Sequence, residues 1–205
     1  FDCSDLGANN VTLTVTDDGG NTDDCIAIVT VIDTIAPTVI CQNITVSLDG
    51  SGNAVITGAD LNNNSTDNCG TGSLTYSSDV TTFSSVGTYT VTLTVTDASG
   101  NSSTCSATVT VNDNNPPIAV CQPVTIYLDA SGNATIVASD IDGGSTDNGT
   151  IASLIASQTA FDCSDLGANN VTLTVTDDGG LSASCVAVVT VLDTIAPGVD
   201  CQNIT

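Results

Sequence analysis

The chain has 205 residues, of which 23 are acidic, and it contains no Lys, Arg or His, so its formal net charge is −23. Nucleic acid is excluded as a partner because phosphate contacts need Lys or Arg, and an anionic membrane surface would repel the chain. A Ser/His/Asp triad is excluded as well. An acidic disordered tail would lack apolar residues, whereas 40% of this chain is hydrophobic.

Sequence motifs recur with a period of 80 residues. Cys41, Cys121 and Cys201 are spaced in this way, and residues 1–45 repeat as 161–205 with nine differences. A fixed period of this length indicates a tandem array of small domains. The chain starts and stops within a repeat and has no Met, so we expect it to be a section of a longer array.

Each repeat is predicted to be an Ig-like β-sandwich of about 80 residues with roughly seven strands, so the fold class is all-β. The predicted domains are the C-terminal half of a repeat (1–36), two complete repeats (37–116 and 117–196) and the first strand of the next (197–205).

Within the first complete repeat the alternation of apolar and polar residues predicts strands, and Asp and Gly predict the turns. The clearest strand has Val91, Leu93 and Val95 on one face. In chain order we predict strands at Thr38–Leu48, Ala54–Ala59, Ser73–Ser78, Thr81–Ser84, Thr88–Thr96 and Thr104–Val111, with turns at Asp49–Asn53 and Asp97–Asn101 and a polar loop at Asp60–Gly72. No stretch has helical spacing.

The seams between repeats contain no flexible linker. Pro37 and Pro117 stand directly at the seams, and Pro fixes φ and stiffens the passage. A Gly/Ser linker would have indicated loosely connected beads. We therefore expect a semi-rigid rod.

Strand direction predicts that acidic loops gather where each repeat begins. The first strand runs away from that pole and the second returns to it, so the loop after the second strand and the turn before the last strand both lie there. The candidate metal ligands at these poles are Asp33, Asp60, Asn62, Asn64, Asp67 and Asp97 for the first complete repeat, and Asp113, Asp140, Asp142, Asp147, Asp177 and Asp178 for the second.

Calcium is the predicted cofactor because it takes six to eight oxygen ligands from carboxylates, amides and backbone carbonyls. Converging carboxylates repel one another, and the chain offers no Lys or Arg to neutralise them. Asp and Asn are also ordinary turn residues, and Asp177 and Asp178 precede two Gly residues in a good metal-free hairpin turn. For a single turn the metal-free interpretation is favoured. For the loops at Asp60 and Asp140 together with the linker Asp, calcium is favoured.

Nine Cys residues at recurring positions indicate an oxidising, extracellular setting. The first and last strands of such a sandwich run parallel and adjacent, which predicts the disulfides Cys41–Cys105 and Cys121–Cys185. Cys25 and Cys201 would then pair beyond the chain, a rival pairing is Cys25–Cys41, and Cys3, Cys69 and Cys163 have no clear partner.

Several segments of the chain together resemble a known family. They read PTVICQNITVSLDGSGNAVIT, STDNCG, VGTYTVTLTVTDASGNSSTCSATVTV and DTIAP. They are similar to hyalin-type (HYR-like) Ig repeats, in particular those along giant cell-surface adhesins of gliding bacteria. The resemblance implies extracellular stalks, adhesion and no catalysis. Such repeats usually carry four Cys, and neither complete repeat here has all four. The seam VNDNNPP also resembles the calcium-binding linkers of cadherins.

The sequence thus predicts a structural role outside the cell, secreted or on the cell surface. A calcium-stiffened, disulfide-stapled rod or filament of an adhesin is preferred, and a calcium-dependent carbohydrate-binding or cell-adhesion module is the alternative. The expected partners are neighbouring repeats, identical chains in a filament, and surface polysaccharide. A pair of Asp residues can hydrolyse a glycoside, but the Asp positions recur in every repeat and fall in turns. We therefore predict no enzyme.

Overall fold

The computed structural model describes residues 1–70 and 74–202, and it is built almost entirely of β-strands. Its contacts group the residues into two compact units. Unit 1 comprises Phe1–Ile44, Val55–Thr81 and Thr88–Val109, and unit 2 comprises Thr45–Ala54, Thr82–Gly87 and Thr110–Thr205. The repeat boundaries predicted from the sequence stay a prediction.

Unit 2 contains two sheets that enclose an apolar core. A four-stranded sheet has the order β11-β13-β14-β9, and a two-stranded sheet pairs β10 with β12. These strands are β9 (Val124–Tyr127), β10 (Asn133–Thr135), β11 (Ile151–Ala156), β12 (Ala160–Asp162), β13 (Gly167–Asp177) and β14 (Ser182–Leu192). β13 and β14 form an antiparallel hairpin, and the first strand β9 pairs in parallel with the last strand β14.

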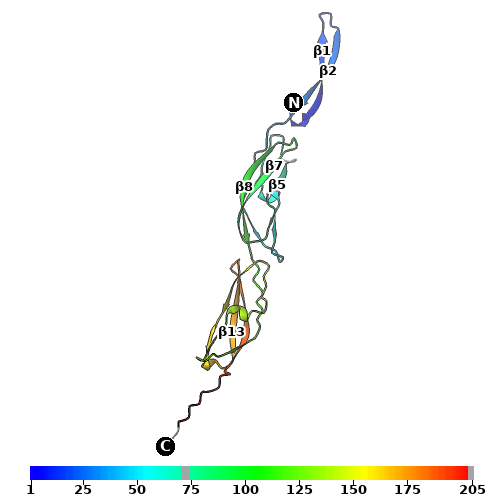
Figure 1. The fold of residues 1–205 in the computed structure, drawn as a ribbon. Helices are drawn as coiled ribbons and strands as arrows, with labels where there is room; N and C mark the ends of the chain where they lie inside the picture. The colour runs from blue at the N-terminus through cyan, green and yellow to red at the C-terminus, as the bar shows by residue number, and fades with distance from the viewer. Residues whose placement is uncertain (71–73, 203–205) are drawn as a thin grey trace. The chain divides into compact units, whose positions relative to one another are not determined.

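The preceding part of the chain has the same kinds of sheet. Its four-stranded sheet has the order β3-β8-β7-β5, and two further sheets pair β1 with β2 and β4 with β6 (Figure 1). These strands are β1 (Gly7–Thr16), β2 (Thr22–Val31), β3 (Ile44–Ser47), β4 (Ala54–Val55), β5 (Thr75–Ser78), β6 (Thr82–Phe83), β7 (Gly87–Thr96) and β8 (Ser102–Asn112). Short helical turns are η1 (Cys3–Asp5), α1 (Gly58–Leu61), η2 (Ala138–Asp140) and η3 (Cys163–Asp165).

The all-β, Ig-like sandwich prediction is confirmed, with differences in detail. The described residues of each complete repeat form six strands rather than about seven. The predicted strand Thr38–Leu48 is regular only at Ile44–Ser47, and its first part makes isolated bridges at Thr38 and Cys41. The second predicted strand shortens to Ala54–Val55, because Asp60 caps a helical turn that periodicity had not indicated. Parts of the predicted loop Asp60–Gly72 and strand Ser73–Ser78 lie outside the described residues.

The alternation in the long hairpin strands sets the core as the sequence predicts. Val91, Leu93 and Val95 of β7 are 0% exposed, and so are their counterparts Val171, Leu173 and Val175 of β13. Every second side chain of a strand points to the same face, and the Thr residues between them stay partly exposed. The core cluster of unit 2 joins this face to Ile136 and Phe161, which lie on or beside the two-stranded sheet.

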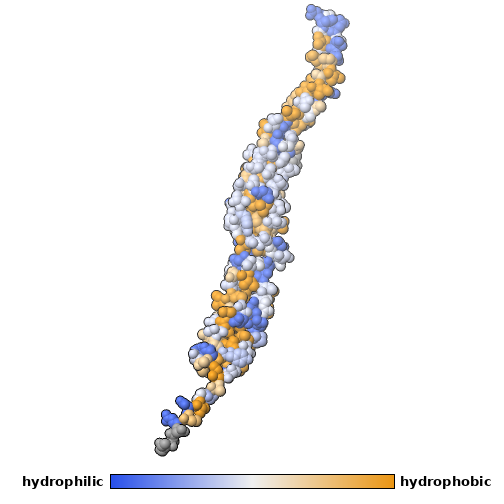
Figure 2. Space-filling model, in the orientation of Figure 1, coloured by the Kyte–Doolittle hydropathy of each residue, from blue (hydrophilic) through white to orange (hydrophobic). Residues whose placement is uncertain are grey.

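The hairpin β1–β2 shows that this burial depends on the covering sheet. β1 and the first ten residues of β13 have the same sequence, GANNVTLTVT. In β1, however, Leu13 is 58% exposed and Val15 is 61% exposed, since among the described strands β1 pairs only with β2. Figure 2 shows apolar residues at the surface beside the hydrophilic tip of this hairpin.

This sequence identity provides a matched test of core packing. We expect Leu173→Ala to lower the local free energy of unfolding by about 2–5 kcal/mol, the usual range for such a cavity. Leu13→Ala changes the same residue in the same decapeptide and should cost well under about 1 kcal/mol. Hydrogen exchange at the amides of β13 and β1, read by mass spectrometry, measures both effects. Equal losses in the two hairpins would contradict the proposed core.

Candidate metal centre

Carboxylates of unit 2 converge beside the tip of its long hairpin. Asp113 follows β8, Asp147 lies in the loop before β11, and Asp177 is the last residue of β13. One oxygen from each of the three lies within 4.8 Å of the others. Asp178 follows in the turn, and its backbone N–H donates to the Thr150 carbonyl at 2.9 Å. We call these four residues the Asp113 cluster.

Local backbone hydrogen bonds hold three of these side chains by one oxygen each. Asp147 Oδ2 accepts the N–H of Gly149 at 2.7 Å, and Asp177 Oδ1 accepts that of Leu181 at 2.7 Å. Asp113 Oδ1 accepts the N–H two residues further along the chain at 3.0 Å. These bonds orient the carboxylates and leave the second oxygen of each without a donor.

Four buried oxygens of the Asp113 cluster have no hydrogen-bond partner. They are Asp113 Oδ2, Asp147 Oδ1, Asp177 Oδ2 and Asp178 Oδ1. Asp113 is only 5% exposed and Asp177 only 2%. Buried polar atoms are nearly always paired, and two carboxylate charges about 5 Å apart repel by roughly 3 kcal/mol at an effective dielectric constant of about 20. With no cationic side chain in the sequence, these oxygens fit a bound cation.

Gly149 keeps the space between the carboxylates free of side-chain atoms. A Cβ at this position would lie 2.8 Å from Asp113 Oδ2, 3.1 Å from Asp178 Oδ1 and 3.2 Å from Asp147 Oδ2. Three carboxylate oxygens therefore border the space that a side chain at this position would fill. Calcium prefers such an all-oxygen set, with ligand distances of about 2.3–2.6 Å. The residues present fit this ion.

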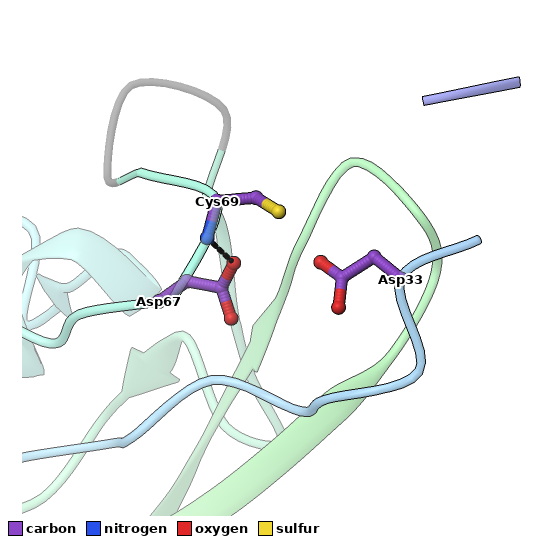
Figure 3. Close-up of side chains that lie close together, drawn as sticks. All are labelled: Asp33, Asp67 and Cys69. Atoms are coloured by element: carbon purple, nitrogen blue, oxygen red, sulfur yellow. Dashed lines mark hydrogen bonds between the residues drawn. The ribbon is translucent and has the colours of Figure 1, made fainter. Parts of the chain in front are cut away.

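A second group, the Asp33 cluster, lies in unit 1 and consists of Asp33, Asp67 and Cys69. Figure 3 shows the two carboxylates facing one another with the Cys69 sulfur above them, and Asp67 accepts the Cys69 N–H at 3.0 Å. Cys69 is bonded to Cys3 in a disulfide, so its sulfur is not available as a thiolate ligand. Asp67 Oδ1 is the sole buried, unpartnered carboxylate oxygen of this cluster among the described residues.

An amide satisfies the hairpin-turn carboxylate beside the Asp33 cluster. Asn101 Nδ2 donates to Asp97 Oδ2 at 2.9 Å and to the carbonyl oxygen of Asp33 at 3.1 Å. One period later the same position is Leu181, which has no donor in its side chain. This difference leaves Asp177 Oδ2 unpaired where Asp97 Oδ2 is paired.

The two clusters therefore differ at three aligned positions, and all three changes favour a cation in the Asp113 cluster. Cys69 is replaced by Gly149, which opens the space, and Asn101 is replaced by Leu181, which removes the competing donor. Ala98 is replaced by Asp178, which adds a carboxylate. Sequence reasoning treated both seams alike, although comparison at the 80-residue offset contains this signal.

The other predicted ligands lie apart from these two clusters, and local structure uses the oxygens of four of them. Asp60 and Asp140 cap short helical turns by accepting the N–H groups of Thr57 and Val137. The remaining pair closes loop turns: Asn62 Oδ1 accepts the N–H of Ser65 at 3.0 Å, and Asp142 Oδ1 accepts the N–H of Ser145 at 3.0 Å. Asn64 is exposed and adopts a positive φ of 58°.

Among the described residues, three disulfides join six of the nine cysteines, namely Cys3–Cys69, Cys41–Cys105 and Cys121–Cys185. The last two are the pairs expected from the parallel first and last strands. The rival pairing Cys25–Cys41 is wrong in this structure, because Cys41 is bonded to Cys105 and Cys25 is free. Sequence reasoning missed Cys3–Cys69, which spans 66 residues and joins residues that the sequence assigns to two successive repeats.

Asp97 offers a test of the amide interaction by pH. Burial raises its pKa, but hydrogen bonds from the Asn101 side chain and from the backbone of Asn101 and Ser99 outweigh this, so the pKa of Asp97 is lowered. A lowered folded-state pKa contributes stability that is complete above the ordinary value of about 3.9 and is lost as pH falls through the folded-state pKa.

We expect Asn101→Ala to move the pKa of Asp97 upward and to weaken resistance to acid unfolding. Carboxyl chemical shifts followed by NMR during acid titration measure the pKa. Asp49, whose pKa is lowered by backbone hydrogen bonds from Asn53 and Ser51, serves as the internal control and should not move. An unchanged Asp97 titration in the variant would show that the amide does not stabilise the charged carboxylate.

Comparison with known proteins agrees with the resemblance seen in the motifs. The family model of the HYR domain matches residues 32–111. A crystal form of protocadherin Gamma B7 extracellular cadherin domains 1-4 aligns with 93% of this chain and 59% of that chain, at 14% identity and a TM-score of 0.37. The protocadherin GammaB4 extracellular domain aligns with 93% of this chain and 39% of that chain, at 17% identity and a TM-score of 0.37.

A structure of mouse cadherin-23 EC22-24 aligns with 95% of this chain and 77% of that chain, at 15% identity and a TM-score of 0.39. The chain thus spans about three-fifths and two-fifths of the two protocadherin chains. Over the described residues, none of the helices has the length and apolar character needed to cross a membrane. The HYR resemblance is confirmed over residues 32–111, the part of the chain that the family model of the HYR domain matches.

Proposed function

We propose that this chain is part of an extracellular adhesion-type repeat array in which calcium at the Asp113 cluster and disulfides stiffen the seams between sandwiches. The single observation that carries the calcium step is the set of four buried, unpartnered carboxylate oxygens. The HYR domain and the three disulfides support an extracellular, structural role. The array serves as the stalk or filament of a surface adhesin.

Hydrogen bonds hold the segment that carries Asp113 to the C-terminal end of β3 and the residue after it. Asn114 Nδ2 donates to Ser47 Oγ at 2.8 Å, and Asn115 Nδ2 donates to the Leu48 carbonyl at 3.4 Å. Asp113 thus enters the cluster on a restrained segment. A cation bound there links this segment to the loop and the hairpin of the following repeat.

Asn148 adds a direct polar link across the same seam. Its Nδ2 donates to the Asp49 carbonyl at 3.1 Å and to Asp113 Oδ1 at 3.2 Å. It therefore contacts the turn of one repeat and the linker at once. These contacts support an ion at a position where bending would separate its ligands, which is how a cation would stiffen a chain of domains.

A structural role also suits the chemistry that the chain lacks. Without His, Lys or Arg, the chain lacks the most frequent general base of enzymes and their cationic anion clamps. The buried carboxylates lie at a seam and are fixed by backbone hydrogen bonds. This arrangement favours ion binding over proton transfer.

Calcium should raise the thermal stability of the protein and bind at the Asp113 cluster. We expect Asp147→Asn to weaken binding by about tenfold or more, because it removes one charge and one ligand while keeping the acceptor for the Gly149 N–H. Asp129→Asn removes the same charge from a turn outside the cluster, where Asp129 accepts the Ser131 and Asn133 N–H groups. Calorimetry and melting curves with and without EDTA measure the effect.

The control variant Asp129→Asn should bind calcium like the parent protein. Equal binding by both variants would place the ion elsewhere, and no calcium-dependent change in the parent would refute the calcium step. Such a result would leave the disulfide-stapled array standing.

The substitution Leu181→Asn tests why the two clusters differ. It introduces the amide that pairs with the turn carboxylate at Asn101, so it should occupy Asp177 Oδ2 and lower calcium affinity by roughly tenfold. Leu181→Ala, which adds no donor, is the matched control and should bind nearly as well as the parent. If both variants lose the same affinity, the amide is not the cause.

A further inference from the structure

Cys163 lies in the same local structure as a cysteine that forms a disulfide with the next repeat. Residues 1–20 and 161–180 are identical in sequence. Cys3 and Cys163 each begin a three-residue helical turn, and each turn is capped by the preceding Asp, which accepts a backbone N–H at 2.7 Å. Cys3 is bonded to Cys69, whereas Cys163 is exposed and free.

Part of the surroundings of Cys163 repeats those of Cys3, although the Cys163 sulfur also lies 3.8 Å from the Gly132 carbonyl oxygen. A hollow lined by Cys3, Asp33 and Ile35 also includes Cys69. A second hollow is lined by Cys163, Asp193 and Ile195, the counterparts of the first three residues. The linkers have the same turn, because Asp33 and Asp193 each accept the N–H two residues further on, at 3.0 and 2.9 Å.

At the two seams that the chain contains in full, cysteines occupy either both positions of this disulfide or neither. The first seam has both Cys3 and Cys69. At the second seam the Cys69 position is Gly149, and residues 81–90 of the preceding repeat contain no Cys. Of the two seams for which the chain contains both positions, one therefore has both cysteines and the other has neither.

We propose that Cys163 is placed to form an inter-repeat disulfide with a cysteine at the Cys69 position of a repeat joined in phase after residue 205, 66 residues on. The two thiols lose two protons and two electrons, and glutathione disulfide takes them up as it becomes two glutathione thiols. The hollow around Cys163 would then hold the loop of that repeat that corresponds to Asn68 and Cys69. This inference does not depend on calcium.

The test extends the chain by its own sequence. A copy of residues 46–116 is appended after Thr205, which continues the repeat in phase, in a Cys25→Ser background that removes one unrelated thiol. A matched control carries Gly at the copied Cys69 position, as the chain does at Gly149. Both proteins are refolded in a glutathione redox buffer and alkylated, and their disulfides are mapped by mass spectrometry.

We expect no free thiol in the first protein and a peptide that links Cys163 to the copied Cys69. The control should retain one free thiol, at Cys163. In both proteins Cys201 should pair with the copied Cys105, which reports that the appended repeat has folded. If Cys201 pairs while Cys163 stays free beside a copied Cys69, the inference is wrong, and a link from Cys163 to any other cysteine would also overturn it.

Discussion

The constraint that shapes this protein is its lack of any cationic side chain. All 23 acidic residues must reach water, a neutral hydrogen-bond donor or an ion. Most turn acids meet the first two requirements, as at Asp49, which accepts the N–H groups of Ser51 and Asn53. Such bonds favour the charged form of the carboxylate. In the Asp113 cluster four buried oxygens have no donor, and a bound ion is the proposed way to satisfy them.

The seams respond to this constraint in two ways. One seam has the disulfide Cys3–Cys69 and the amide of Asn101, which together provide a covalent link and neutral donors. The other seam has Gly149 in place of the cysteine and Leu181 in place of the asparagine, and it gains the carboxylate of Asp178. A covalent link is insensitive to salt and chelators but is broken by reductants, whereas an ion-bridged seam has the opposite sensitivities. If calcium binds at the Asp113 cluster as proposed, an array that mixes the two kinds of seam would keep some stiff joints under either challenge.

Much of the fold follows from sequence because its signals are local and repeated. The alternation around Leu93 predicts a half-buried strand, and the 80-residue period predicts that Leu173 is its equivalent. Other features depend on tertiary structure. The cap at Asp60 turns a predicted strand into a helical turn, since one carboxylate accepts two donors of Thr57. The alternating direction of the strands correctly predicts that Asp147 and Asp177 lie at the same end of the repeat. It could not show that Asp140 and Asp142 accept hydrogen bonds within their own turns.

Repetition itself supplies the finer information that a single domain would lack. Gly149 alone is an unremarkable loop glycine, and Leu181 alone is a turn residue with a partly exposed side chain. Set beside Cys69 and Asn101, each becomes a change of known direction at a position of known geometry. Because both environments occur in one chain, the shared scaffold cancels from the comparison. What remains is the difference between a seam closed by sulfur and amide bonds and a seam whose carboxylate oxygens lack partners.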